Sequence, residues 1–119
     1  MNENDFFTKG MSYAQRHNAE ENKFNLSRFK SYFGTSPRIC VILWSKIREN
    51  ANSANMCYYH LLWGLLFLKL YSSEAVLSGI VGCSEKTFRK YCWKSVISIA
   101  ELKPQIVSSY VNSFPKIIF

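Results

Sequence analysis

The stretch that decides the fold is "SEAVLSGIVGCSEKTFRKYCW", residues 73–93. Its first part predicts a short helix of about two turns, which Ser73 caps and Gly82 ends. Its second part predicts a longer helix from about Glu85 to Leu102, with Ser84 bonding the free N–H groups at its start. A glycine between the two helices permits a tight turn because glycine accepts positive φ. A short helix, a tight turn and a long helix are the parts of a helix-turn-helix.

Other segments also show helical signals. A helix over about 37–49 is expected to begin with Pro37 behind the N-cap Ser36, since the first helical position tolerates a missing N–H. Residues 57–71 are apolar nearly all round, which predicts a helix at the centre of a bundle. Residues 24–33 form a short amphipathic candidate. Alternating strand patterns appear only in the apolar tail, so the predicted fold class is all-α: a small helical bundle that contains a helix-turn-helix.

Composition divides the chain into three parts. Residues 1–23 are polar and rich in Asn and Glu, which predicts a disordered N-terminal arm, with Phe6 and Phe7 as the only sign of docking. Residues 24–107 are expected to form the helical domain, and residues 108–119 an apolar tail. A chain of 119 residues holds one domain and one modest core.

The charge of the chain favours a polyanionic partner. The formal net charge is +7 and the pI is near 9.4, which suits nucleic acid or an anionic membrane surface. The most apolar segment, residues 61–70, is too short to span a bilayer, and Lys69 interrupts it. No secretory signal opens the sequence. We therefore expect no membrane partner and an intracellular protein, nuclear or cytoplasmic.

Metal and enzyme signatures are missing from the sequence. The four cysteines include no C-x-x-C pair, which argues against zinc and for reduced thiols. Cys57 and His60 are spaced to share a helix face, but no second pair accompanies them, and His60 is expected to be a satisfied core histidine. There is no Gly-rich phosphate loop, no G-x-S-x-G and no histidine dyad. We expect no cofactor and no catalytic residue.

A helical projection of the last long helix separates a buried stripe from a basic face. The predicted stripe comprises Phe88, Tyr91, Cys92, Ser95, Val96 and Ile99. In helix-turn-helix proteins the first turns of the second helix contact base edges in the major groove of duplex DNA, where Arg and Lys read guanine or hold phosphates. The residues predicted to contact DNA are Ser84, Lys86, Thr87, Arg89, Lys90 and Lys94.

Two further features leave alternatives open. Many ordinary helices carry a solvated lysine-rich face, so the basic face alone does not establish DNA binding. Trp93 and Ile97 also point outward, which predicts packing on the N-terminal helices or on a partner domain. A second basic set is either a collective phosphate-holding surface or a series of solvated side chains. Its members are Lys23, Arg28, Lys30, Arg38, Lys46 and Arg48.

The order of several motifs resembles a known family. "FGTSPRICVILWSKI" at 33–47 and "HLLWGLLFLKLYSSEAVLSGIVGCSEKTFRKYCW" at 60–93 are similar to the N-terminal region of eukaryotic DDE-superfamily transposases of the Harbinger-like kind. In that family a G-T-S-P start, an L-L-W-x-L-x-F-L-K helix and an E-K-T-F-R-K helix precede the nuclease domain. The resemblance covers about residues 33–107. It implies a helix-turn-helix module that recognises transposon ends.

The family's nuclease chemistry does not carry over to these residues. A DDE nuclease needs three carboxylates that hold two divalent metals. Here the only aspartate is Asp5, and the glutamates are dispersed. The tail after Val107 no longer resembles the family, which suggests a truncated element. Two hypotheses follow: a DNA-binding module without nuclease activity, or an interaction fragment with no DNA role. In the second, Trp93 and Ile97 mediate self-association or docking to the missing nuclease domain.

Overall fold

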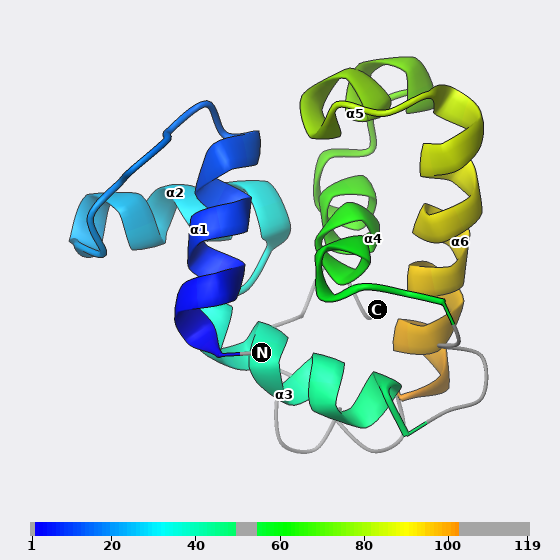
Figure 1. Cartoon of the computed structure of the whole chain (residues 1–119), viewed down its shortest axis with the longest axis horizontal. Helices are drawn as coiled ribbons and strands as arrows, with labels where there is room; N and C mark the ends of the chain where they lie inside the picture. Colours follow the sequence, from blue (N-terminus) through cyan, green and yellow to red (C-terminus); the bar gives the residue numbers. More distant parts are fainter. Residues whose placement is uncertain (1, 50–54, 103–119) are drawn as a thin grey trace.

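The computed structural model describes residues 2–49 and 55–102, and within these ranges it contains six α-helices and no strand (Figure 1). The predicted all-α class is confirmed. The helices are α1 (Glu3–Tyr13), α2 (Lys23–Phe33), α3 (Pro37–Ile47), α4 (Tyr58–Leu70), α5 (Glu74–Val81) and α6 (Glu85–Glu101). The predicted boundary at 107 and the apolar tail lie outside the described residues. No described helix combines the length and the apolar character needed to cross a membrane.

The expected disordered arm is wrong, because most of its first half is helix α1. The Asn2 side chain accepts a hydrogen bond from the Asp5 N–H, and the Asp5 carboxylate accepts one from the Asn2 N–H, so the two residues form a capping box. Phe6, Phe7 and Met11 are buried, with exposed fractions of 0%, 2% and 1%. Burial of these large apolar side chains attaches α1 to the rest of the core.

Helix α4 is the centre of the molecule, as its apolar sequence predicts. It contacts all five other helices, and its contact with α6 is the most extensive (Figure 1). Leu61, Leu62, Leu65 and Leu66 are fully buried in the core. At the crossing, Ser95 of α6 donates its hydroxyl hydrogen to the carbonyl oxygen of Leu61 at 3.4 Å. This crossing fixes where α6 lies relative to the rest of the fold.

The link between α5 and α6 is short and well bonded. Gly82 adopts the left-handed conformation (φ 79°), and the N–H groups of Gly82 and Cys83 both donate to the carbonyl oxygen of Ser78, at 2.8 and 3.0 Å. This pattern ends α5, with one carbonyl oxygen of its last turn accepting both hydrogen bonds. The Ser84 hydroxyl then accepts from the Thr87 N–H at 3.2 Å and begins α6. The two helices predicted from residues 73–93 are confirmed.

Candidate nucleic-acid interface

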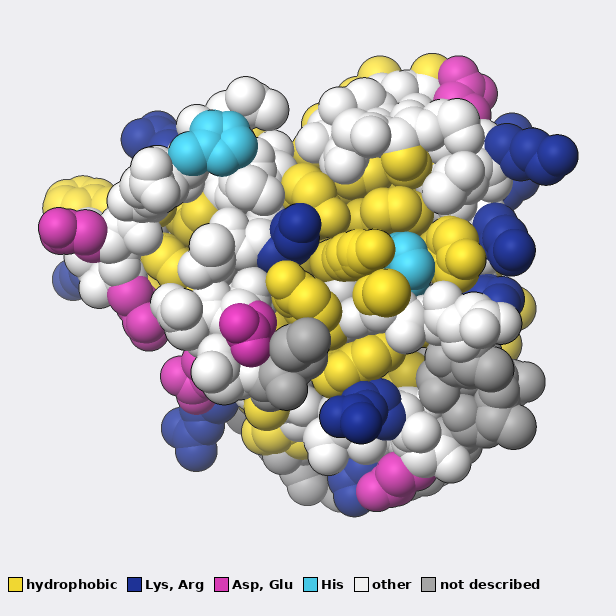
Figure 2. Space-filling model, in the orientation of Figure 1, with side chains coloured by type: hydrophobic (Ala, Val, Ile, Leu, Met, Phe, Trp, Pro, Cys, Tyr) yellow, Lys and Arg dark blue, Asp and Glu magenta, His cyan; other side chains and the backbone are white. Residues whose placement is uncertain are grey.

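The predicted division of α6 into a buried and an exposed face is confirmed. Phe88, Cys92, Ser95 and Ile99 are buried, and Tyr91 and Val96 are partly buried. The predicted DNA-contacting residues lie together on the N-terminal half of the helix: Ser84, Lys86, Thr87, Arg89 and Lys90 are exposed, and Lys94 is partly buried. Figure 2 shows cationic side chains, in dark blue, along the edge of the molecule that α6 forms in Figure 1.

Arg89 differs from the other cations of this face because it has a carboxylate partner. Its Nε lies 3.0 Å from both carboxylate oxygens of Glu74, at the start of α5. The ion pair joins α5 to α6 across their turn. Both side chains keep contact with solvent, with exposed fractions of 53% and 30%, so the pair contributes at most about 1 kcal/mol to stability. Arg89 therefore makes a structural contact as well as forming part of the basic face, and the helical pattern of the sequence does not predict that contact.

The two hydroxyl groups of the site also bond to each other. Ser84 donates its hydroxyl hydrogen to Thr87 Oγ1 at 3.0 Å while it caps the helix. The expected capping role of Ser84 is confirmed. Because Thr87 only accepts in this contact, its own hydroxyl hydrogen remains a donor for a ligand.

Tyr91 lies beneath two of the three lysines of this face. The Nζ atoms of Lys90 and Lys94 lie 5.3 and 5.6 Å from the centre of the Tyr91 ring, within the range of cation–π attraction. The Tyr91 ring also stacks on His60, with the ring centres 3.9 Å apart and the planes 7° apart. Lys86 and Lys90 have no ion-pair partner within residues 2–49 and 55–102, which leaves their charges available to a polyanion.

His60 is the satisfied core histidine that the sequence predicts. Its Nδ1 accepts a hydrogen bond from the Cys57 N–H at 2.9 Å, and the side chain is 5% exposed. Burial, with a smaller contribution from the charge of Lys94, lowers the pKa of His60 to about 4. The imidazole is therefore neutral at neutral pH. In the described part of the chain, no group of His, Cys, Asp and Glu residues is arranged to hold a metal ion.

Trp93 and Ile97 point outward as predicted, with exposed fractions of 47% and 51%. Trp93 contacts Phe67 of α4, with the ring centres 5.5 Å apart. The expected packing on the N-terminal helices is not what the structure shows. The outward side chains of α6 therefore include the cations of its first turns and, further along the helix, the exposed apolar side chains of Trp93 and Ile97.

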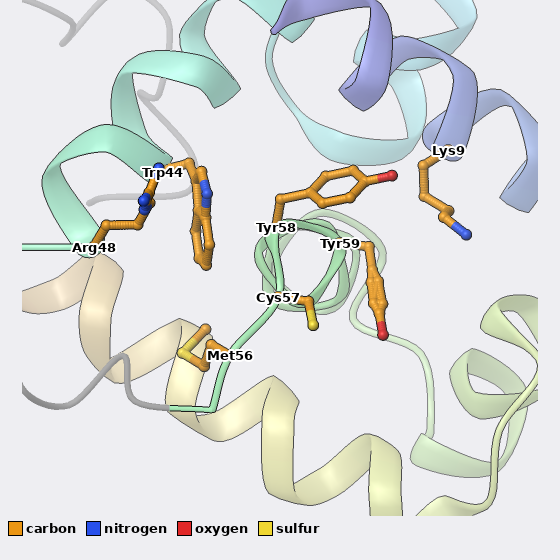
Figure 3. Close-up of a pocket in the computed structure, with 7 residues that line it drawn as sticks. All are labelled: Lys9, Trp44, Arg48, Met56, Cys57, Tyr58 and Tyr59. Atoms are coloured by element: carbon orange, nitrogen blue, oxygen red, sulfur yellow. The ribbon is translucent and has the colours of Figure 1, made fainter. Parts of the chain in front are cut away.

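The second basic set is exposed, on α2, on α3 and at the end of α3. Arg48 of this set lines a pocket of about 610 Å³ together with Lys9, Trp44 and the residues that begin α4 (Figure 3). No sequence pattern indicates this pocket, because Lys9 lies in the segment predicted to be a disordered arm and residues 57–71 are predicted to form a central core helix.

Comparisons with known proteins identify no relative of this chain. No family model, curated protein or solved structure matches this chain. The resemblance to Harbinger-like transposases therefore rests on the sequence motifs, and the case for a function rests on the geometry of α5 and α6.

Proposed function

We propose that the chain is a non-catalytic DNA-binding module that binds duplex DNA through the first turns of α6. One observation carries the proposal: the outward face of these turns presents cations and hydroxyl groups, whereas the inward face is buried in the core. A short helix, a Gly-containing turn and a longer helix with a basic outer face are the parts by which helix-turn-helix proteins enter the major groove.

The contacts of each residue suggest its role on DNA. Lys86 and Lys90 are four residues apart on one helical face and lack carboxylate partners, so they are placed to contact guanine or phosphate together. Thr87 donates a hydrogen bond to a base or phosphate. Arg89 must exchange Glu74 for DNA, so it contributes less than the two lysines. Ser84 holds the helix start in place.

Charge and sequence motifs support the same proposal. The formal net charge of +7 attracts a polyanion, and a basic surface adds sequence-independent affinity through contacts to phosphates. The motif resemblance suggests transposon ends as the target and a transposase-derived origin. It supports no nuclease role for this chain, since its carboxylates are dispersed.

The test compares two triple variants that remove the same charge from different places. Each variant replaces three basic residues by alanine: Lys86, Arg89 and Lys90 in the first, and Lys23, Arg28 and Lys30 in the second. Binding to a labelled duplex is measured by fluorescence anisotropy at several salt concentrations.

Contacts to three phosphates correspond to a change of about 2–3 in the slope of log affinity against log salt. We expect the variant in α6 to lose most of the affinity for DNA and to show a salt slope that is shallower by about 2–3. The variant in α2 should retain most of the affinity and most of the slope. Equal losses in the two variants would show that total charge, and not the α6 face, determines binding.

A second candidate function is protein interaction. Exposure of Trp93 and Ile97 beside Phe67 favours it, because exposed aromatic side chains often mark interfaces. In this case the chain has no DNA role, and Trp93→Ser with Ile97→Ser abolishes self-association or partner binding. Sedimentation velocity measures self-association: a monomer at all concentrations argues against homodimers through this surface.

A further inference from the structure

The pocket between α1, α3 and the start of α4 combines aromatic rings with two cations. It has a volume of about 610 Å³, and its lining comprises Lys9, Trp44, Arg48, Met56, Cys57, Tyr58 and Tyr59. Figure 3 shows the Lys9 and Arg48 side chains on opposite sides of the ring-bearing residues. This volume is typical of sites for small organic ligands.

The rings of the pocket are held by their neighbours. Tyr58 and Tyr59 lie with ring centres 5.6 Å apart and planes 22° apart, and the Phe6 ring meets Tyr58 edge-on at 5.3 Å. Tyr58 and Tyr59 are only partly buried, whereas Trp44 is 7% exposed. The two tyrosine rings therefore keep exposed surface on which a flat aromatic group can stack.

The cations of the pocket lack anionic partners. Lys9 Nζ lies 5.2 Å from the centre of the Tyr59 ring, and neither Lys9 nor Arg48 forms an ion pair with a described residue. Asp5, on the same helix as Lys9, is engaged in the cap of α1. Two cations without carboxylate partners beside aromatic rings suit a ligand that carries both an aromatic ring and a negative group.

We propose that this pocket binds a nucleotide, with its base stacked on the exposed surface of Tyr58 and Tyr59 and its phosphate held by Lys9, whose amine lies beside the Tyr59 ring. Arg48, on the opposite side of the rings, holds the next phosphate when the nucleotide belongs to a single strand. The same chemistry has two sources: a free mononucleotide, or an unpaired nucleotide in a single strand. The site is separate from the duplex-binding face of α6, so the two proposals can fail independently.

A line of rings runs from the pocket towards α6 and favours the single strand. Tyr59 lies 4.6 Å from His60, and His60 lies 3.9 Å from Tyr91, measured between ring centres. Tyr91 in turn lies beneath the Lys90 amine. Figure 2 shows hydrophobic side chains gathered around a histidine in the middle of this face, with cations at its edges. His60 is buried between its neighbours, but Tyr59 and Tyr91 at the two ends of the line are partly exposed, and each lies beside a lysine amine. Exposed rings flanked by cations are how proteins hold single-stranded nucleic acid.

The test measures binding of four probes to the full chain by isothermal titration calorimetry. The probes are thymidine monophosphate, thymidine, inorganic phosphate and an oligothymidylate of about eight nucleotides. We expect the monophosphate to bind at least about tenfold more tightly than thymidine or phosphate, because only it engages both the rings and the cations. The proposal is overturned if thymidine monophosphate, thymidine and inorganic phosphate bind equally. It is also overturned if neither thymidine monophosphate nor the oligothymidylate shows saturable binding.

The two sources are separated by comparing the oligothymidylate with the monophosphate. Tighter binding of the oligothymidylate identifies a single strand as the ligand, and equal binding per site identifies the free nucleotide. Either outcome supports a nucleotide pocket only if it depends on the pocket residues.

The variants therefore assign the binding to the pocket. Tyr59→Leu and the double variant Lys9→Gln, Arg48→Gln are each expected to weaken the monophosphate about tenfold, whereas Tyr59→Phe, which keeps the ring, is expected to bind like the parent. The control Lys23→Gln, Lys30→Gln removes two charges from α2, outside the pocket and the ring line, and leaves the monophosphate unchanged. Far-UV circular dichroism checks that every variant is folded. Monophosphate binding that survives both pocket variants in folded protein refutes the assignment.

Discussion

Gly64 lies where α4 crosses α6, and the structure leaves no room there for a methyl group. A Cβ atom at this position would lie 2.7 Å from Ser95 Cβ and closer still to the Ser95 hydroxyl. Carbon atoms in contact are normally about 3.5–4.0 Å apart, so α6 must move if Gly64 becomes alanine. Gly79, on α5, is the matched control, because an added Cβ there meets nothing within 4 Å.

Gly64→Ala and Gly79→Ala are expected to change stability in opposite directions. At position 64, overpacking the core costs about 1–3 kcal/mol, and the better helix propensity of alanine offsets about 1 kcal/mol of this. Gly64→Ala is therefore expected to destabilise the fold by up to about 2 kcal/mol, which lowers the melting temperature by up to roughly 8 °C. Gly79→Ala has only the favourable contribution, so it is expected to stabilise by about 0.5–1 kcal/mol.

Urea unfolding followed by circular dichroism measures these free energies, and a double-mutant cycle identifies the cause. Ser95→Gly removes both atoms that crowd position 64, so the double variant Gly64→Ala, Ser95→Gly should be more stable than the sum of the single effects predicts, by at least about 1 kcal/mol. Additive effects would refute the close crossing. So would a stabilising Gly64→Ala, since it would mean that α4 and α6 are not in contact at this point.

Three further predictions follow from the charges and the turn. Glu74→Gln removes the ion-pair partner of Arg89, so the affinity for duplex DNA should rise. The slope of log affinity against log salt in anisotropy titrations should become steeper by about one. An equal effect of the control Glu21→Gln would contradict this reasoning. The pKa of His60 is lower in the folded protein (about 4) than its ordinary value of 6.5, so the unfolded chain binds the proton more tightly between these values. The free energy of unfolding, measured by urea titration, should therefore be about 2 kcal/mol lower at pH 5 than at pH 7. Most of this difference should be missing from folded His60→Gln. Gly82→Ala should cost about 1 kcal/mol despite open space around it, because φ is 79°; no loss would argue against the left-handed turn.

Helix ends were predictable because their signals are local. Ser36, Ser73 and Ser84 cap helices as their spacing predicts, and Gly82 ends α5 with positive φ. The same local logic holds for Asn2, whose capping box marks α1. The polar composition of residues 1–23 nevertheless led to the prediction of a disordered arm. The burial of Phe6 depends on contacts of α1 with distant helices, which no local pattern reveals.

The candidate sites divide in the same way. Exposure of Lys86 and Lys90 follows from helical geometry and was predictable. The ion pair of Arg89 with Glu74 joins residues fifteen positions apart on two helices, so it depends on how α5 packs against α6. The pocket near Lys9 is lined by residues from three helices or their ends, so the sequence pattern of a single helix could not predict it.

Contact between the first turns of α6 and duplex DNA can be observed residue by residue through backbone amide chemical shifts. A duplex is titrated into isotopically labelled protein at two salt concentrations. We expect the largest shifts to cluster at residues 84–90 and to weaken as salt increases. Shifts confined to α2 and α3, or no shifts at low salt, would contradict it.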